Sequence, residues 1–272
     1  MIIGEPRCRT DSVRGSLCNS NAVAIVKASV CRNLFLGLIS LVPILAFALS
    51  FEFVRDGFWF LLGKLRGGYT VAERLEQLGP IVEARLRRTV ESAGLVYPPR
   101  DIAYVAFKDS RRLEVYGRMA AEEPWRFVKA YSILALSGKP GPKLMEGDYQ
   151  VPEGIYRAEF LNANSRFHLA IRLDYPNEFD KEMALADARD KLGGDIMIHG
   201  SSVSIGCLAM GNRAVEDLFI LAALASKERV RIVIAPTDFR VAAPLIPIVH
   251  RDWIDSLYAD LEDELQQFPK GT

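Results

Sequence analysis

An uncharged apolar run from Asn33 to Phe51 is the feature that most restricts how this chain can fold. At a rise of about 1.5 Å per residue, a helix of this length comes close to the ~30 Å hydrocarbon core of a bilayer. The run has no amphipathic stripe, so a buried core helix is the weaker interpretation. Aromatic residues follow it from Phe58 to Phe60, where an interfacial belt would lie. We therefore expect residues 34–62 to form a membrane anchor or a signal segment.

Charges on the two sides of the run predict its orientation. Basic residues outnumber acidic ones before the run, and the basic residues are Arg7, Arg9, Arg14, Lys27 and Arg32. Positively charged flanks stay on the cytoplasmic side of a membrane, so residues 1–33 are expected in the cytoplasm and the body of the protein outside it. Ala46-Phe47-Ala48 has the small-x-small form of a signal-peptidase site, which leaves both a retained anchor and a cleaved signal open.

Charge balance and cysteine usage exclude two classes of protein. The chain has 34 basic and 34 acidic side chains, with no concentrated basic face, so nucleic acid is not the expected ligand. Three of the four cysteines, Cys8, Cys18 and Cys31, lie before the apolar run, and only Cys207 follows it. A disulfide framework is therefore not expected, and Cys207 is a lone thiol in the main domain.

Helical spacing dominates the segment directly after the membrane run. Thr70 and Glu73 have the spacing of a capping box, and apolar residues then recur at intervals of three or four up to Val90. Gly79-Pro80 should kink this helix, and Gly94 with Pro98-Pro99 should end it. We interpret residues 63–99 as an amphipathic helical spacer outside the site.

The rest of the chain reads as mainly β with helices, an α+β fold. Strands are expected at 102–107 and 113–116, which form a hairpin, and at 127–136, 154–160, 166–173, 195–199 and 230–235. Helices are expected at 214–225, with Asn212 as the N-cap, and at 252–268. Residues 100–250 thus form the main domain, and residues 251–272 form a C-terminal helix.

The segment from Asp195 to Asn212 carries the residues best suited to chemistry. It places His199 at the end of a strand and Cys207 eight residues later, with glycines and serines between them. Cysteine attacks as the thiolate, and a neighbouring imidazole is the usual group that takes its proton. Backbone N–H groups around Gly206 and the Ser204 hydroxyl would hold an oxyanion or support the loop.

Other interpretations of the same residues stay open at this point. A lone cysteine is often a small buried hydrophobe, and a histidine at a strand end is often a satisfied polar group. A metal site would need more ligands than the sequence provides near Cys207, so no metal is expected.

This segment resembles the signature of the L,D-transpeptidase catalytic domain, also called the YkuD domain. In that signature an upstream histidine precedes a Ser-x-Gly-Cys core, here His199 and Ser204-Ile205-Gly206-Cys207. The wording is closest to the YafK-like branch, and so are four other stretches within residues 101–236: Gly138–Lys143, Glu146–Asp148, Val151–Tyr156 and Tyr175–Asn177. Many members carry a second histidine where this chain has Ile205, so the role of that histidine does not carry over.

The resemblance implies a small β-sandwich with a few helices and an exported enzyme without a cofactor. It implies that Cys207 attacks the carbonyl at the L-centre of diaminopimelate in a peptidoglycan stem peptide, with His199 as general base and acid. His168, Arg172 and Ser201 are candidate substrate-binding residues, and no metal takes part. The catalytic domain would lie in the bacterial periplasm, held to the inner membrane through residues 34–51.

Three functions remain open from the sequence. A transpeptidase would pass the acyl group from Cys207 to an amine, whereas a hydrolase of the same family would pass it to water and release wall-bound protein or a stem-peptide group. A wall-attached lipoprotein is a candidate partner in either case. The third function, of another class, is a non-catalytic peptidoglycan-binding module.

Overall fold

The computed structural model describes residues 67–243 and 251–271. The predicted cytoplasmic segment 1–33 and membrane segment 34–62 lie outside these residues. Among the helices that the structure does describe, none has the length and apolar character needed to cross a membrane.

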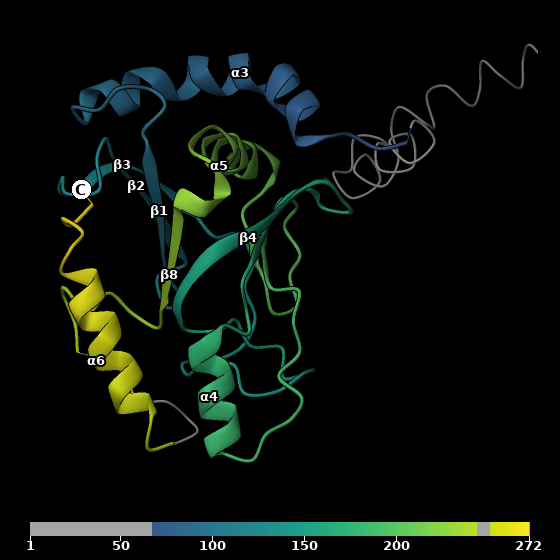
Figure 1. The fold of residues 1–272 in the computed structure, drawn as a ribbon, viewed down its shortest axis with the longest axis vertical. Coiled ribbons are helices and arrows are strands. Elements are labelled where there is room, and N and C mark those ends of the chain that lie inside the picture. The colour runs from purple at the N-terminus through teal and green to yellow at the C-terminus, as the bar shows by residue number, and fades with distance from the viewer. Residues whose placement is uncertain (1–66, 244–250, 272) are drawn as a thin grey trace, which may run out of the picture. The chain divides into compact units, whose positions relative to one another are not determined.

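Helix α3 (Val71–Ser92) confirms the helix predicted from the spacing of its apolar residues (Figure 1). The Thr70 hydroxyl accepts the Glu73 N–H at 3.1 Å, and the Glu73 carboxylate accepts the Thr70 N–H at 2.6 Å, which completes the capping box. The helix continues through Pro80 without interruption. Its buried residues Val82, Leu86 and Val90 belong to the same core as α5 (Asn212–Ala225), so the predicted spacer shares a core with the main domain.

Eight strands form one sheet in the order β3-β2-β1-β8-β4-β5-β6-β7. The strands are β1 (Asp101–Phe107), β2 (Arg112–Arg118), β3 (Arg126–Ser132), β4 (Gly154–Ser165), β5 (His168–Leu173), β6 (Met197–His199), β7 (Leu208–Ala209) and β8 (Val230–Ala235). Neighbours pair antiparallel except β1 with β8 and β6 with β7, which are parallel. The predicted hairpin is β1–β2, and the mixed α+β class is confirmed.

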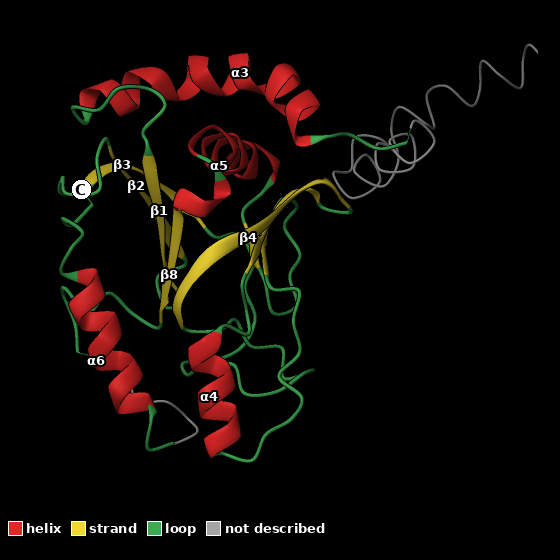
Figure 2. Ribbon diagram, in the orientation of Figure 1, coloured by secondary structure: helices red, strands yellow, loops and turns green. Residues whose placement is uncertain are grey.

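The long strand β4 joins the two halves of this sheet. Its first residues, Gly154 to Arg157, pair with β8, while the residues from Ala158 onward pair with β5. The register shifts between Ala158 and Phe160, and such bulges bend a strand and increase its twist. Figure 2 shows β4 as a long, curved strand beside β8.

Helices cover both faces of β1 and β8, with α5 on one side and α6 (Ile254–Leu265) on the other (Figure 1). Alternate residues of β1 divide between two cores: Ile102, Tyr104 and Ala106 pack with α3 and α5, whereas Ala103, Val105 and Phe107 pack with α6. Because a strand buried on both faces has no polar side, β1 has no alternation of polar and apolar residues from Ile102 to Phe107, and only its first residue, Asp101, is charged. Helix α4 (Glu178–Ala186) follows β5 and has its own capping box from Asn177.

The predicted N-cap of α5 is wrong by one residue. Gly211, with φ 77°, occupies the cap position, and it has no side chain that could cap the helix. Asn212 is the first helical residue, and its side-chain oxygen accepts the Ser201 N–H at 2.9 Å. The Asn212 side chain, predicted as a local cap, therefore makes a tertiary contact with the loop after β6.

Candidate functional site

His199 and Cys207 lie on neighbouring segments at the β6–β7 end of the sheet. His199 ends β6, and Cys207 directly precedes β7. The two strands are parallel and in register, with Ile198 opposite Leu208 and His199 opposite Ala209. On its other side, Ala209 forms an antiparallel bridge with Ala135. The fold thus brings the predicted base and nucleophile to adjacent strands.

The imidazole of His199 is buried and oriented by two contacts. Its side chain is only 2% exposed, and its ring stacks on Phe167 with centroids 4.6 Å apart. Nδ1 lies 2.5 Å from the Gly200 carbonyl oxygen, which can only accept a hydrogen bond, so Nδ1 carries the proton. Burial lowers the pKa of His199 and keeps the ring neutral, which leaves the lone pair on Nε2. This tautomer is the form that a general base requires.

The Cys207 thiol is held in its protonated form. Burial raises the pKa of Cys207, although a backbone hydrogen bond from Met197 and the charge of Lys143 oppose the shift. Its Sγ lies 3.7 Å from the Asp195 carbonyl oxygen, and the thiol is free. At neutral pH such a thiol reacts only when a neighbouring base removes its proton.

Two hydroxyl groups fix the loop from Ser204 to Cys207, the thiol loop. Ser204 Oγ accepts the Cys207 N–H at 3.0 Å and donates to the Cys207 carbonyl at 2.6 Å. Ser137 Oγ accepts the Gly206 N–H at 2.7 Å and donates to the Tyr149 carbonyl at 2.7 Å. Gly206 has φ 83°, a conformation that side chains with a Cβ rarely adopt. In this arrangement Ser204 and Gly206 shape the loop, and both N–H groups are already engaged.

Arg172, on β5, reaches the site through Asp195. Its Nη1 lies 3.1 Å from Asp195 Oδ1, and its Nε lies 3.0 Å from Glu159 Oε2. The Asp195 backbone carbonyl is the group that contacts Cys207 Sγ. Arg172 therefore lies near the thiol, but two carboxylates already pair with its guanidinium.

The other two candidate substrate-binding residues face α5 and not the thiol loop. His168 Nε2 lies 3.0 Å from Glu216 Oε1, on α5. Ser201 is buried with φ 63°; its N–H donates to Asn212 and its carbonyl accepts the Gly211 N–H. Both residues fix the approach of α5 to the sheet.

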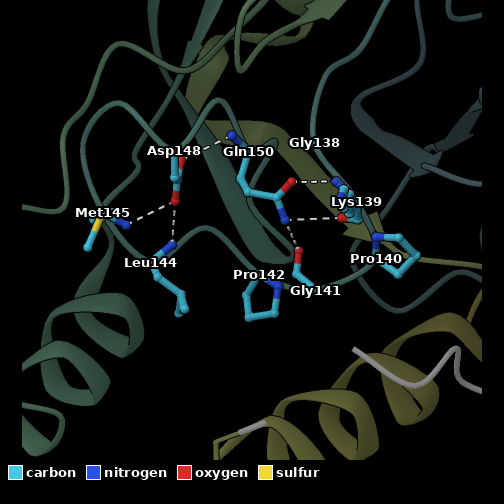
Figure 3. A pocket seen from close by; sticks show the side chains of 9 residues that line it. All are labelled: Gly138, Lys139, Pro140, Gly141, Pro142, Leu144, Met145, Asp148 and Gln150. Atoms are coloured by element: carbon cyan, nitrogen blue, oxygen red, sulfur yellow. Dashed lines mark hydrogen bonds between the residues drawn. The ribbon is translucent and has the colours of Figure 1, made fainter. Parts of the chain in front are cut away.

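A cavity of about 340 Å³ lies beside the thiol loop, within the glycine- and proline-rich loop before β4 (Figure 3). Asp148 accepts the N–H groups of Leu144, Met145 and Gln150, and the Gln150 side chain bonds the backbone of Lys139 and Gly141. The side chains of Asp148 and Gln150 are thus satisfied by the backbone of the loop itself. The sequence did not predict this cavity, although the glycines and prolines of its loop are evident there.

No group of three or more histidine, cysteine, aspartate or glutamate side chains within residues 67–243 and 251–271 is placed to hold a metal ion.

Alkylation of Cys207 by iodoacetamide is expected to accelerate with pH beyond the range of an ordinary thiol, because burial raises the pKa of Cys207. The rate is measured at this residue by peptide mass mapping, since the chain contains three other cysteines. The same chain unfolded in urea supplies the reference profile. A folded-state rate that already levels off at neutral pH would contradict this prediction.

Comparison with known proteins identifies relatives over part of the chain. Over 115 residues, 42% of this chain, the sequence is 37% identical to proteins named "Putative L,D-transpeptidase YafK" from Escherichia coli strain K12 and from Escherichia coli O157:H7. The match spans 44% of each of these relatives. No family model matches the chain. The similarity to L,D-transpeptidases of the YafK type that the sequence predicted is confirmed.

Solved structures also match parts of the chain. The helical cell shape determining protein Pgp2 from Campylobacter jejuni matches with a TM-score of 0.41 and 25% identity, over 59% of this chain and 54% of that chain. Mycobacterium tuberculosis L,D-transpeptidase 1 matches with a TM-score of 0.29 and 15% identity, over 49% of this chain and 61% of that chain.

Proposed function

We propose, from its similarity to L,D-transpeptidases, that this chain is an exported cysteine acyltransferase that acts on peptidoglycan stem peptides. The observation that supports the proposal is that a neutral, oriented His199 ends β6, while a free Cys207 thiol directly precedes β7, the strand that pairs with β6. The protein would be anchored in the inner membrane through residues 34–51, with its catalytic domain in the periplasm. Its fold would be the L,D-transpeptidase β-sandwich, preceded by one membrane helix.

The first half of the proposed reaction forms a thioester. His199 Nε2 takes the proton from Cys207 Sγ, and the thiolate attacks the carbonyl carbon at the L-centre of diaminopimelate. The tetrahedral intermediate then breaks the amide bond, and the leaving amine receives the proton from His199. The products are a Cys207 thioester and a free amine.

The second half transfers the acyl group to an acceptor. An incoming amine gives up a proton to His199 and attacks the thioester carbonyl, which forms a new amide bond and restores the Cys207 thiol. With a second stem peptide as acceptor, the product is a 3-3 cross-link. With water as acceptor the same site would be a hydrolase, and a wall-attached lipoprotein would then be a candidate leaving group.

The test is to incubate the full-length chain in detergent with diaminopimelate-type sacculi that carry attached lipoprotein, and to analyse the products by mass spectrometry. We expect new 3-3 linked dimers with the untreated protein and none with protein alkylated by iodoacetamide. Free lipoprotein with tripeptide stems and no dimers would replace transpeptidation by hydrolysis. Identical products from untreated and alkylated protein would leave only a binding module.

A further inference from the structure

An ion pair is buried where β1 ends and β4 begins. Lys108 Nζ lies 2.9 Å from Glu153 Oε1, and the two side chains are 5% and 0% exposed. Removing two charges from water costs several kcal/mol per ion unless hydrogen bonds satisfy each group. A buried ion pair is by itself weak evidence for stability. Its role depends on the other groups that the two side chains contact.

The partners of this ion pair are backbone groups of the glycine- and proline-rich loop before β4 that lines the cavity, the cavity loop. Besides Glu153, Lys108 Nζ donates to the Gly141 carbonyl at 3.0 Å and to the Val151 carbonyl at 2.9 Å, which uses all three ammonium protons. Glu153 Oε1 also accepts the Gly141 N–H at 2.9 Å. Both polar groups of the Gly141 backbone are therefore held by one buried pair.

Helix α6 completes the arrangement. Tyr258 donates its hydroxyl hydrogen to Glu153 Oε2 at 2.8 Å. Burial, with a further contribution from the charge of Glu153, raises the pKa of Tyr258, so this hydroxyl keeps its proton and remains a donor. The C-terminal helix thus contacts the same carboxylate that holds Gly141.

Hydrogen bonds, together with the backbone that joins Tyr149 to Gln150, connect Gly141 to the thiol loop. The Gln150 side chain donates to the Gly141 carbonyl at 3.0 Å and bonds Lys139. The preceding Tyr149 carbonyl accepts the Ser137 hydroxyl, which in turn accepts the N–H of Gly206. The same loop holds Lys143 through Met145 O and Asp148, and the charge of Lys143 lowers the pKa of Cys207.

We propose that Glu153 and Tyr258 are positioning residues for Cys207, because together with Lys108 they hold the loop that fixes Gly206 beside the thiol. The inference rests on the proposed function for its catalytic consequence. On this inference, α6 helps to set the geometry of the site, although this helix contributes no group to the reaction. Small displacements of reacting groups cost large factors in rate, so the loop need not unfold for the effect to appear.

Tyr258→Phe in the full-length chain tests the proposal, since it removes one hydroxyl and preserves the ring in the core. Tyr131→Phe is the matched control: its hydroxyl also donates at 2.8 Å to a carboxylate in an ion pair, that of Asp217, which lies on α5 and pairs with Arg85. We expect Tyr258→Phe to lower kcat about tenfold at nearly constant KM, and Tyr131→Phe to change kcat less than twofold. The thermal midpoints of both variants are measured alongside.

A second readout does not depend on the proposed reaction. The pH midpoint of Cys207 alkylation should move upward in Tyr258→Phe and in Glu153→Gln, because a loosened loop carries the Lys143 charge away from the thiol. Tyr131→Phe should keep the wild-type midpoint. If the wild-type chain turns over no stem peptide, the proposed function fails, while the alkylation midpoints still decide the positioning role. Equal midpoints in wild type, Tyr258→Phe and Tyr131→Phe would overturn the inference.

Discussion

Replacing Cys207 by alanine should reduce turnover of stem peptides by a factor on the order of 10⁴ or more, because no other group can form the thioester. The substitution removes one sulfur atom from a half-buried position, and the backbone contacts of Cys207 to Ser204 do not involve that atom. The folded structure should therefore persist. Turnover is measured by mass spectrometry of released products under single-turnover conditions.

The matched control for this prediction uses the other cysteines. Replacing Cys8, Cys18 and Cys31 together by alanine should leave the rate within about twofold, since all three lie before the apolar run in the sequence, far from Cys207. If Cys207→Ala retained the wild-type rate while remaining folded, the nucleophile would have to be assigned elsewhere.

Lys108→Met should destabilise the protein by about 3–5 kcal/mol, because it leaves the Glu153 carboxylate buried without its ionic partner. Methionine approximates the length of the lysine stem, so the loss comes from the charge and not from a cavity. The Gly141 and Val151 carbonyls also lose their ammonium donor. The free energy of unfolding is measured by urea denaturation of the full-length chain.

The double variant Lys108→Met with Glu153→Met separates the burial of a lone charge from the loss of the pair. Replacing both partners by apolar groups removes the uncompensated carboxylate, so the double variant should be more stable than Lys108→Met alone. A double variant that is less stable than the single variant would show that the network stabilises the fold beyond its cost of desolvation.

The boundaries of the regular elements follow from local sequence. The start of α3 at Val71 depends on Thr70 and Glu73, which lie within one helical turn, and the β1–β2 hairpin depends on strands separated by a four-residue turn. Such signals involve residues close in sequence, and they operate before any tertiary contact forms. Asn212 shows where this reasoning fails, since a distant backbone group, the Ser201 N–H, takes the side chain that a helix start would otherwise use.

In the candidate site, too, some features follow from the sequence and others only from the tertiary structure. The motif with His199 and Cys207 gave the two candidate reactive residues, but not the tautomer of the imidazole, which the contact with the Gly200 carbonyl defines, nor its stacking on Phe167. Of the other candidates, Arg172 lies near the thiol through Asp195, whereas His168 contacts Glu216 on α5. The sequence named both as candidate substrate-binding residues, but only packing decided which carboxylates they meet.

By itself, the sequence determined the start of α3, the β1–β2 hairpin and the presence of an apolar segment before the folded domain, and it named His199 and Cys207 as candidates for chemistry. Only the tertiary structure decided how Lys108, Glu153 and Tyr258 meet, because Glu153 accepts hydrogen bonds from two residues that are far from each other in the sequence. Periodicity and capping reflect interactions over a few residues, whereas the pairing of buried charges depends on which distant groups packing brings together once water is excluded.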